Sequence, residues 1–272
     1  MDVLFPRTFL LVFAQIAVGG LFCLSIPPFH SMERGYYKSS AFVFWAIGTL
    51  ATIGHIALWR RADVQLAGGV GPIEIALWSA FCLSAGAYLA TLWGEYVILR
   101  ARLFVASWSI GVVALVVGAS SFAAESQVPV AVIVYPLSFV LAALVLGTAA
   151  SGMLLGHWYL IDRDLSLEPL WRVLRFYGVC LAAQTIVLLV GIAVMATTDT
   201  SYSAMWEEYR WVFLGRMAIS PLGTAVLAAM IWRTLLIPQT MAATGLFYIA
   251  ILGATVGEIM GRYLLFRTGL PL

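Results

Sequence analysis

The chain has 272 residues, of which 62% are hydrophobic and only 10% are charged. A soluble domain carries about 25% charged residues, so the composition excludes a soluble globular protein and indicates a polytopic membrane protein. The formal net charge of +2 gives no basis for nucleic-acid binding. Three cysteines, Cys23, Cys82 and Cys180, lie singly within apolar segments without C-x-x-C spacing, so they are interpreted as small core residues and not as a disulfide framework or an iron–sulfur site.

Eight apolar segments are long enough to cross a bilayer, which requires about 20 residues of helix. Backbone groups in lipid must pair within their own segment, and the sequence lacks strand-like alternation, so each segment is predicted to be a helix. The first stretch has no cleavage pattern and is expected to remain as a span. The sequence predicts a single domain over residues 1–272, an all-α bundle of eight transmembrane helices at residues 8–26, 40–59, 73–93, 102–120, 128–158, 173–196, 209–233 and 240–266.

The charged residues of the predicted loops set the expected orientation. Cytoplasmic loops of membrane proteins carry an excess of Lys and Arg. One side of the predicted bundle holds eight such residues, and the other holds five together with several carboxylates. The first side is expected to face the cytoplasm, which places both termini outside; its residues are Arg34, Lys38, Arg100, Arg102, Arg163, Arg172, Arg175 and Arg233.

A polar cluster is predicted where the second and third segments face each other across a short Gly-rich link. His55 lies about one turn inside the second segment, and Arg60 and Arg61 follow its end. Glu74 opens the third segment at the same depth. Ionisable groups at a membrane boundary are costly and are usually kept for function. Quinol oxidation needs a hydrogen-bond partner and a proton acceptor, which these groups provide; a structural set of salt bridges is the competing interpretation.

Further polar groups lie within the apolar segments. In the last segment Glu258 and Arg262 are four residues apart, so they share a helix face and are expected to pair. Gly257 and Gly261 have the same spacing and allow another helix to pack closely. The charged pair is interpreted either as a tie between helices or as part of a site. The other candidates for the lining of a quinone pocket are Gln15, Arg60 and Arg216.

The three histidines give little support for a transmembrane haem, which usually needs two axial ligands. His30 is expected in a loop, His55 near the outer face and His157 at the inner face, so no two share a depth. The sequence contains no metal-ligand motif. His157 is interpreted as part of an aromatic belt, with a second quinone site or a proton entry as the alternative.

Three stretches combine into a pattern seen in one family. The first helix reads Phe9-Leu-Leu-Val-Phe-Ala-Gln15-Ile-Ala-Val-Gly19-Gly20. Six residues separate His55 from Arg61, and a carboxylate follows in Pro72-Ile73-Glu74-Ile75. The last helix contains Gly257-Glu258-Ile-Met-Gly261-Arg262-Tyr263. Together with the eight predicted spans, these stretches resemble the DmsC-type membrane-anchor subunits of dimethyl sulfoxide reductase, which are distantly akin to the polysulfide and nitrite reductase anchors.

The resemblance implies a haem-free anchor in the bacterial inner membrane that exchanges electrons between menaquinol and partner subunits. The implied partners on the outer face are a four-cluster iron–sulfur subunit and a molybdopterin catalytic subunit, so the metal cofactors belong to other chains. By matching position, His55, Arg61 and Glu74 are the implied quinol-site residues.

Two other classes of function remain open on the sequence. A secondary transporter would use Glu258 and Arg262 as coupling groups, but the sequence shows no internal repeat, and its polar residues gather at one face rather than at the midplane. A structural assembly subunit of a respiratory complex would contain the same helices with a degenerate site.

Overall fold

The computed structural model describes residues 4–29, 31–60, 71–126, 130–162, 165–198, 201–237 and 239–271. These residues form helices joined by short turns, and the described part of the chain contains no strand. The prediction of an all-α fold is therefore confirmed. The helices are α1 (Leu4–Cys23), α2 (Arg34–Trp59), α3 (Pro72–Thr91), α4 (Val97–Glu125), α5 (Ala131–Ile161), α6 (Glu168–Thr198), α7 (Ser201–Met217), α8 (Thr224–Leu236) and α9 (Thr240–Thr268), with a π-helical segment η1 (Ala218–Gly223) between α7 and α8.

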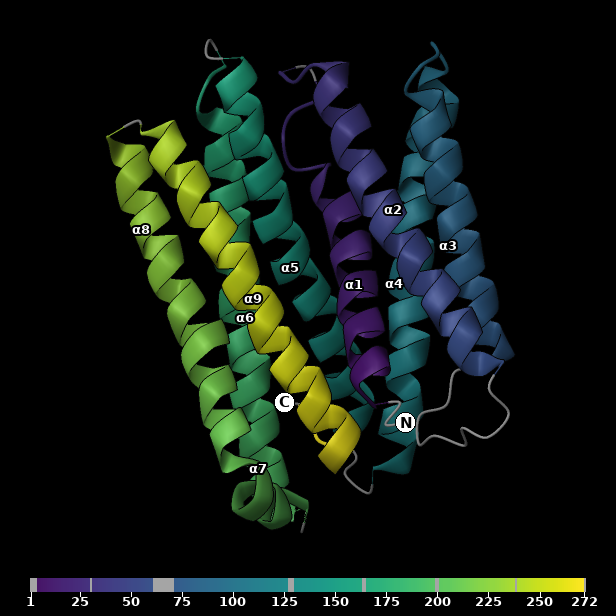
Figure 1. Ribbon diagram of the computed structural model, residues 1–272, viewed down its shortest axis with the longest axis vertical. Coiled ribbons are helices and arrows are strands. Elements are labelled where there is room, and N and C mark those ends of the chain that lie inside the picture. The colour runs from purple at the N-terminus through teal and green to yellow at the C-terminus, as the bar shows by residue number, and fades with distance from the viewer. Residues whose placement is uncertain are drawn as a thin grey trace.

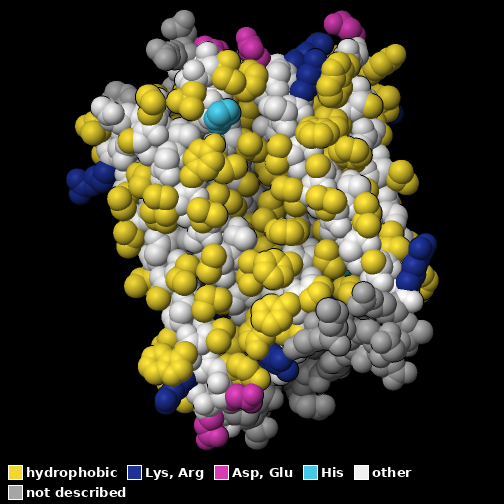
Figure 2. All heavy atoms as spheres, in the orientation of Figure 1, with side chains coloured by type: hydrophobic (Ala, Val, Ile, Leu, Met, Phe, Trp, Pro, Cys, Tyr) yellow, Lys and Arg dark blue, Asp and Glu magenta, His cyan; other side chains and the backbone are white. Residues whose placement is uncertain are grey.

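Among the described residues, eight stretches are long and apolar enough to cross a membrane, which confirms the predicted number of spans. One of them runs continuously through α7, η1 and α8, and each of the others lies within a single helix. Hydrophobic side chains cover the middle of the face drawn in Figure 2, and charged side chains gather mostly toward its two ends. The chain is a multi-pass helical membrane protein. Both termini lie in the lower part of Figure 1, as an even number of spans requires.

The first helix begins earlier than predicted. The sequence analysis started this span at residue 8, whereas α1 begins at Leu4 and contains Pro6 in its first turn. Proline is favoured there because the first backbone N–H groups of a helix have no partner within it. The earlier start places Arg7 on the helix, whereas the predicted span of residues 8–26 leaves it outside.

The predicted loop at residues 197–208 is wrong. The structure continues α6 to Thr198 and begins α7 at Ser201. The first turns of α7 contain Trp206, Glu207 and Glu208, whose polarity lowers the hydropathy without interrupting the helix. Hydropathy measures how favourably a segment partitions into lipid, and a polar segment can still be helical. The low hydropathy at these residues therefore did not indicate a loop.

Helix α1 occupies the centre of the bundle, between α5 on one side and α2 to α4 on the other (Figure 1). It packs on α5 at backbone contact: a Cβ added at Gly19 would overlap the Ala143 carbonyl oxygen, and one at Gly147 would overlap the backbone of Gly19. Small residues allow such close packing in lipid, where helices associate through shape rather than through the hydrophobic effect. This contact fixes α1, and with it Arg7, Leu11 and Gln15, against α5.

The seventh span widens into a π-helical turn at Pro221. Proline has no backbone N–H and disturbs the regular hydrogen-bond pattern, and π-turns are a common accommodation. Helix α9 packs closely on this turn, because a Cβ added at Gly257 would overlap the Ser220 side chain. The close contact brings Arg216, two residues before the π-segment, beside Glu258 on α9.

Candidate functional site

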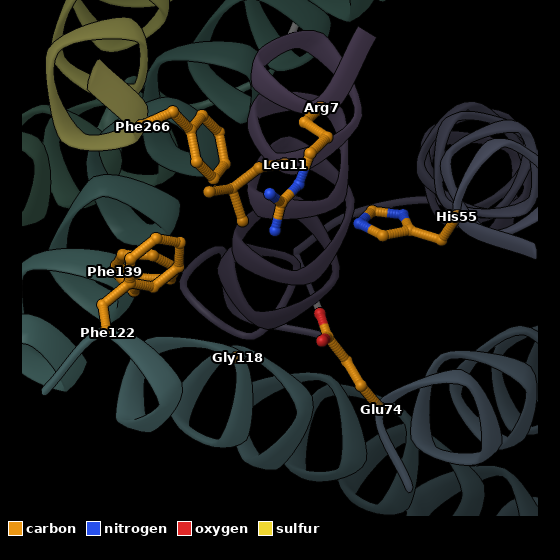
Figure 3. Close-up of a pocket in the computed structure, with 8 residues that line it drawn as sticks. All are labelled: Arg7, Leu11, His55, Glu74, Gly118, Phe122, Phe139 and Phe266. Carbon is orange, nitrogen blue, oxygen red and sulfur yellow. The ribbon is translucent and has the colours of Figure 1, made fainter. Parts of the chain in front are cut away.

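A small cavity of about 30 Å³ lies at the end of the bundle that holds both termini. Six helices contribute to it, which makes it a meeting point of segments far apart in the sequence. Figure 3 shows the guanidinium of Arg7, the imidazole of His55 and the carboxylate of Glu74 converging on it. The lining residues are Arg7 and Leu11 of α1, His55 of α2, Glu74 of α3, Gly118 and Phe122 of α4, Phe139 of α5 and Phe266 of α9.

His55 lies one turn before the end of α2 and is only 6% exposed. Its Nδ1 atom is 2.8 Å from the carbonyl oxygen of Ala51. A carbonyl oxygen only accepts hydrogen bonds, so Nδ1 carries the proton and the neutral ring leaves Nε2 as an acceptor. The ring also stacks on Trp78, with centroids 5.8 Å apart and an interplanar angle of 23°. The imidazole is thus held in one orientation with an acceptor nitrogen available to the cavity.

Glu74 stands in the first turn of α3, after Gly71 and a proline at the start of the helix. A carboxylate is favoured at this position because the helix dipole is positive there. Its Oε1 atom accepts a hydrogen bond of 3.3 Å from Nε1 of Trp78, the same ring on which His55 stacks. The carboxylate also lies against Gly118, where an added Cβ would be 3.1 Å from Oε1. The indole of Trp78 therefore positions both the acid and the imidazole.

The cation of this site is Arg7, which the sequence analysis missed. Its side chain is 7% exposed, and its guanidinium carbon lies 4.8 Å from the centroid of the Phe266 ring. Its guanidinium converges on the cavity with the imidazole of His55 and the carboxylate of Glu74 (Figure 3). A signal for it was present, since the apolar stretch begins at Leu4 and a proline at residue 6 suits a helix start.

Of the two arginines predicted for this role, the one that the structure describes does not line the cavity. Arg60 is the exposed C-cap of α2. Arg61 lies outside the described residues. The observed cluster therefore combines His55 and Glu74, as predicted, with an arginine from the first helix.

Three aromatic rings close the side of the cavity opposite His55 (Figure 3). The Phe122 centroid lies 6.2 Å from that of Phe139 and 5.6 Å from that of Phe266. Aromatic rings prefer offset or edge-to-face contacts with one another, so these three rings can pack against the ring of an aromatic ligand. The cavity thus joins a wall suited to an aromatic ligand with three polar groups suited to its oxygens.

A second polar cluster is buried about 12 Å deeper along α9, at 1.5 Å per residue from Phe266 to Glu258. Glu258 is fully buried and its carboxylate contacts three side chains. Gln184 Nε2 donates to Oε1 at 2.6 Å, and Arg216 Nη1 lies 3.4 Å from the same oxygen. Arg262 Nη2 is 3.3 Å from Oε2. The predicted pairing of Glu258 with Arg262 is present, and Arg216 and Gln184 complete the network.

Phe139 connects the two clusters. Its ring lines the cavity, and the guanidinium carbon of Arg262 lies 4.4 Å from the ring centroid. Gln15 Nε2 donates to the Phe139 carbonyl oxygen at 3.1 Å. Gln15, Glu258, Arg262 and Arg216 therefore do not line the cavity themselves. Gln15 and Arg262 instead hold its aromatic wall in place.

The remaining candidates lie apart from the cavity. His157 is exposed near the other end of α5. The described residues contain no cluster of His, Cys, Asp and Glu that could hold a metal ion. His30 lies outside the described residues.

Neither a family model nor a curated protein matches this chain. The fold and the site define a multi-pass helical membrane protein with a polar, aromatic-walled cavity at one end of the bundle. The geometry of that cavity is the basis for assigning a function.

Proposed function

We propose that this chain is the quinone-reactive membrane anchor of a multi-subunit oxidoreductase, passing electrons between menaquinol and an iron–sulfur partner subunit. The convergence of Arg7, His55 and Glu74 on one aromatic-walled cavity is the observation that supports this proposal. The resemblance of the sequence to DmsC-type anchors points the same way.

The residue types fit the chemistry of a quinol head group. Oxidation of a quinol to a quinone releases two electrons and two protons, so the site must accept protons. His55 Nε2 is oriented to accept a hydrogen bond from one hydroxyl, and Glu74 supplies a second acceptor. Arg7 stabilises the carboxylate charge and donates to a quinone oxygen. The phenylalanine wall packs against the ring.

The cavity must open to admit a ring. Its 30 Å³ accommodates about one or two water molecules. Leu11 lies one turn after Arg7 on the same face of α1, and both side chains are able to change rotamer. A head group enters in this account by displacing water and moving these two side chains.

The position of the cavity suits electron transfer to a partner. It lies at the end of the bundle rather than at its middle, so an acceptor docked on that face comes close to the quinol. We assign this face to the outside of the bacterial inner membrane, from the distribution of Lys and Arg. The proposed partners there are a four-cluster iron–sulfur subunit and a molybdopterin catalytic subunit.

The test is quinol oxidation by membranes that contain the assembled complex, with a menaquinol analogue as donor. We expect His55→Ala to lower turnover about 100-fold, the contribution typical of a proton acceptor. His157→Ala is the matched control, because it removes an exposed histidine from the other end of the bundle, and it should leave turnover unchanged. Equal losses in the two variants, or none in His55→Ala, would contradict the assignment.

Co-purification separates this proposal from the other classes. An anchor brings iron–sulfur and molybdenum-containing subunits with it in mild detergent, whereas a transporter purifies alone. An assembly subunit brings partners but keeps full turnover in His55→Ala. The amount of partner recovered with each variant also shows whether a loss of turnover reflects chemistry or failed assembly.

A further inference from the structure

A second, larger cavity lies at the opposite end of the bundle and has no role in the proposed quinol chemistry. Its volume is about 500 Å³. It is formed by the turn after α1, the start of α2, the end of α3 and the start of α4. Its lining combines two arginines with aromatic and aliphatic side chains: Phe29, Met32, Arg34, Tyr37, Tyr88, Leu92, Val97, Arg100, Ala101, Phe104 and Val105.

Arg100 is the fixed cation of this cavity. Its Nη2 atom donates to the carbonyl oxygens of Thr91 at 3.1 Å and Gly94 at 2.6 Å, so the guanidinium caps the end of α3. Its Nε atom is buried and finds no hydrogen-bond acceptor among the residues that the structure describes. A buried N–H of a charged group without a partner is costly, and an anionic oxygen at this point would satisfy it.

Arg34 is the second cation of this cavity, and its side chain is held less firmly than that of Arg100. It lies 3.7 Å from Glu95, but that carboxylate is 92% exposed. An ion pair between exposed groups is screened by water and contributes little, so Arg34 remains available to a second anion. Arg34 and Arg100 thus place two positive charges on one cavity, at the end of the bundle where Lys and Arg predominate.

The rest of the cavity lining is aromatic or aliphatic, and part of its rim is exposed. Phe29 stacks on Tyr37 with centroids 5.3 Å apart, and Phe104 contacts both Phe29 and Tyr88. On its α4 side the rim is formed by Val97, 67% exposed, and Val105, 50% exposed, which lie two turns apart. An acyl chain that lies along α4 between these valines would contact apolar side chains throughout.

We propose that this cavity binds one anionic phospholipid, with its phosphate between Arg34 and Arg100 and one acyl chain packed against Phe104 and Ala101. Charge complementarity favours an anionic lipid over a zwitterionic one, because both cations of the cavity lack a buried carboxylate partner among the described residues. The aromatic rings and the cations lie at one end of the bundle, and both kinds of side chain are normally enriched at the ends of membrane-spanning helices.

The experiment is native mass spectrometry of the purified chain after exchange into mixed micelles of phosphatidylglycerol and phosphatidylcholine at equal concentration. We expect one retained phosphatidylglycerol, in about tenfold excess over phosphatidylcholine, the effect of one charge-assisted contact. Arg34→Gln should reduce that preference to threefold or less. Glu95→Gln should strengthen retention, because it removes the anion that competes for Arg34.

Two further variants keep the test decisive. Ala101→Phe fills the cavity without changing charge and should abolish retention of the lipid. Arg102→Gln is the matched control: it removes an exposed arginine from the same helix that does not line the cavity, and retention should be unchanged. Equal retention of the two lipids, insensitivity to Ala101→Phe, or retention of a quinone in place of a phospholipid would overturn the proposal.

Discussion

The two buried polar clusters of this protein contain the same kinds of side chain and differ in what those side chains face. In the deeper cluster Glu258 is enclosed by Gln184, Arg216 and Arg262, so its carboxylate is paired within the protein. In the outer cluster His55 and Glu74 are oriented by Trp78 but also face a cavity. The deeper cluster, whose carboxylate is paired within the protein, stabilises the bundle. The outer cluster, whose polar groups line a cavity, is available to a ligand.

The largest expected effect is on stability, at Glu258. Glu258→Gln leaves Arg216 and Arg262 buried without a counter-charge, and breaking a buried pair in this way costs about 3–5 kcal/mol. We expect a markedly lower midpoint of thermal unfolding in detergent. Glu74→Gln, at the edge of a cavity, should lower stability by less than about 1 kcal/mol. Equal shifts in the two variants would remove the distinction between the clusters.

The next effect is on ligand binding, at Arg7. Arg7→Gln removes the cation of the cavity, and a hydrogen bond to a charged group is worth about 1.5–3 kcal/mol. We expect quinol oxidation to require about 10 to 100 times more substrate for half-maximal rate. Arg60→Gln, which removes an exposed arginine, should have no such effect. If Arg60→Gln raised the substrate requirement and Arg7→Gln did not, the cation that binds the quinol would be at the end of α2.

The smallest effect is at Gly118, which lies against the carboxylate of Glu74. The Cβ of Gly118→Ala would stand 3.1 Å from Glu74 Oε1, so the acid must shift by a few tenths of an ångström. We expect a loss of about 1 kcal/mol in stability, at the low end of the cost of overpacking, and a drop of a few-fold in turnover. A change in thermal unfolding without any change in turnover would show that Glu74 has no part in the reaction.

Much of the fold follows from the sequence because apolar length alone specifies spanning helices. The proximity of His55 and Glu74 also followed, since adjacent helices joined by a short link place their facing ends at one depth. The pairing of Glu258 with Arg262 followed from their spacing along one helix.

The other contacts of the two clusters depend on how the helices pack, and the hydrophobic periodicity of the sequence does not specify that packing. Arg7 and Phe266 come from opposite ends of the chain and meet only because α1 is central and contacts α9. Arg216 reaches Glu258 because α9 packs on the π-turn at Pro221, and Gln184 reaches the same carboxylate from α6. A glutamine inside an apolar segment was a usable signal, but its partner was not predictable from sequence spacing.

The most direct measurement is photo-crosslinking of the assembled complex with a menaquinone analogue whose ring bears the reactive group, followed by mapping of the labelled peptide. The account predicts labels near Leu11, Phe122 or Phe266, competed away by unlabelled quinol and lost in His55→Ala. Labels confined to the cavity at Arg34 and Arg100, or to the lipid-facing groove between α6 and α8 that Ala182 and Ala228 line, would contradict the assignment of the quinol site.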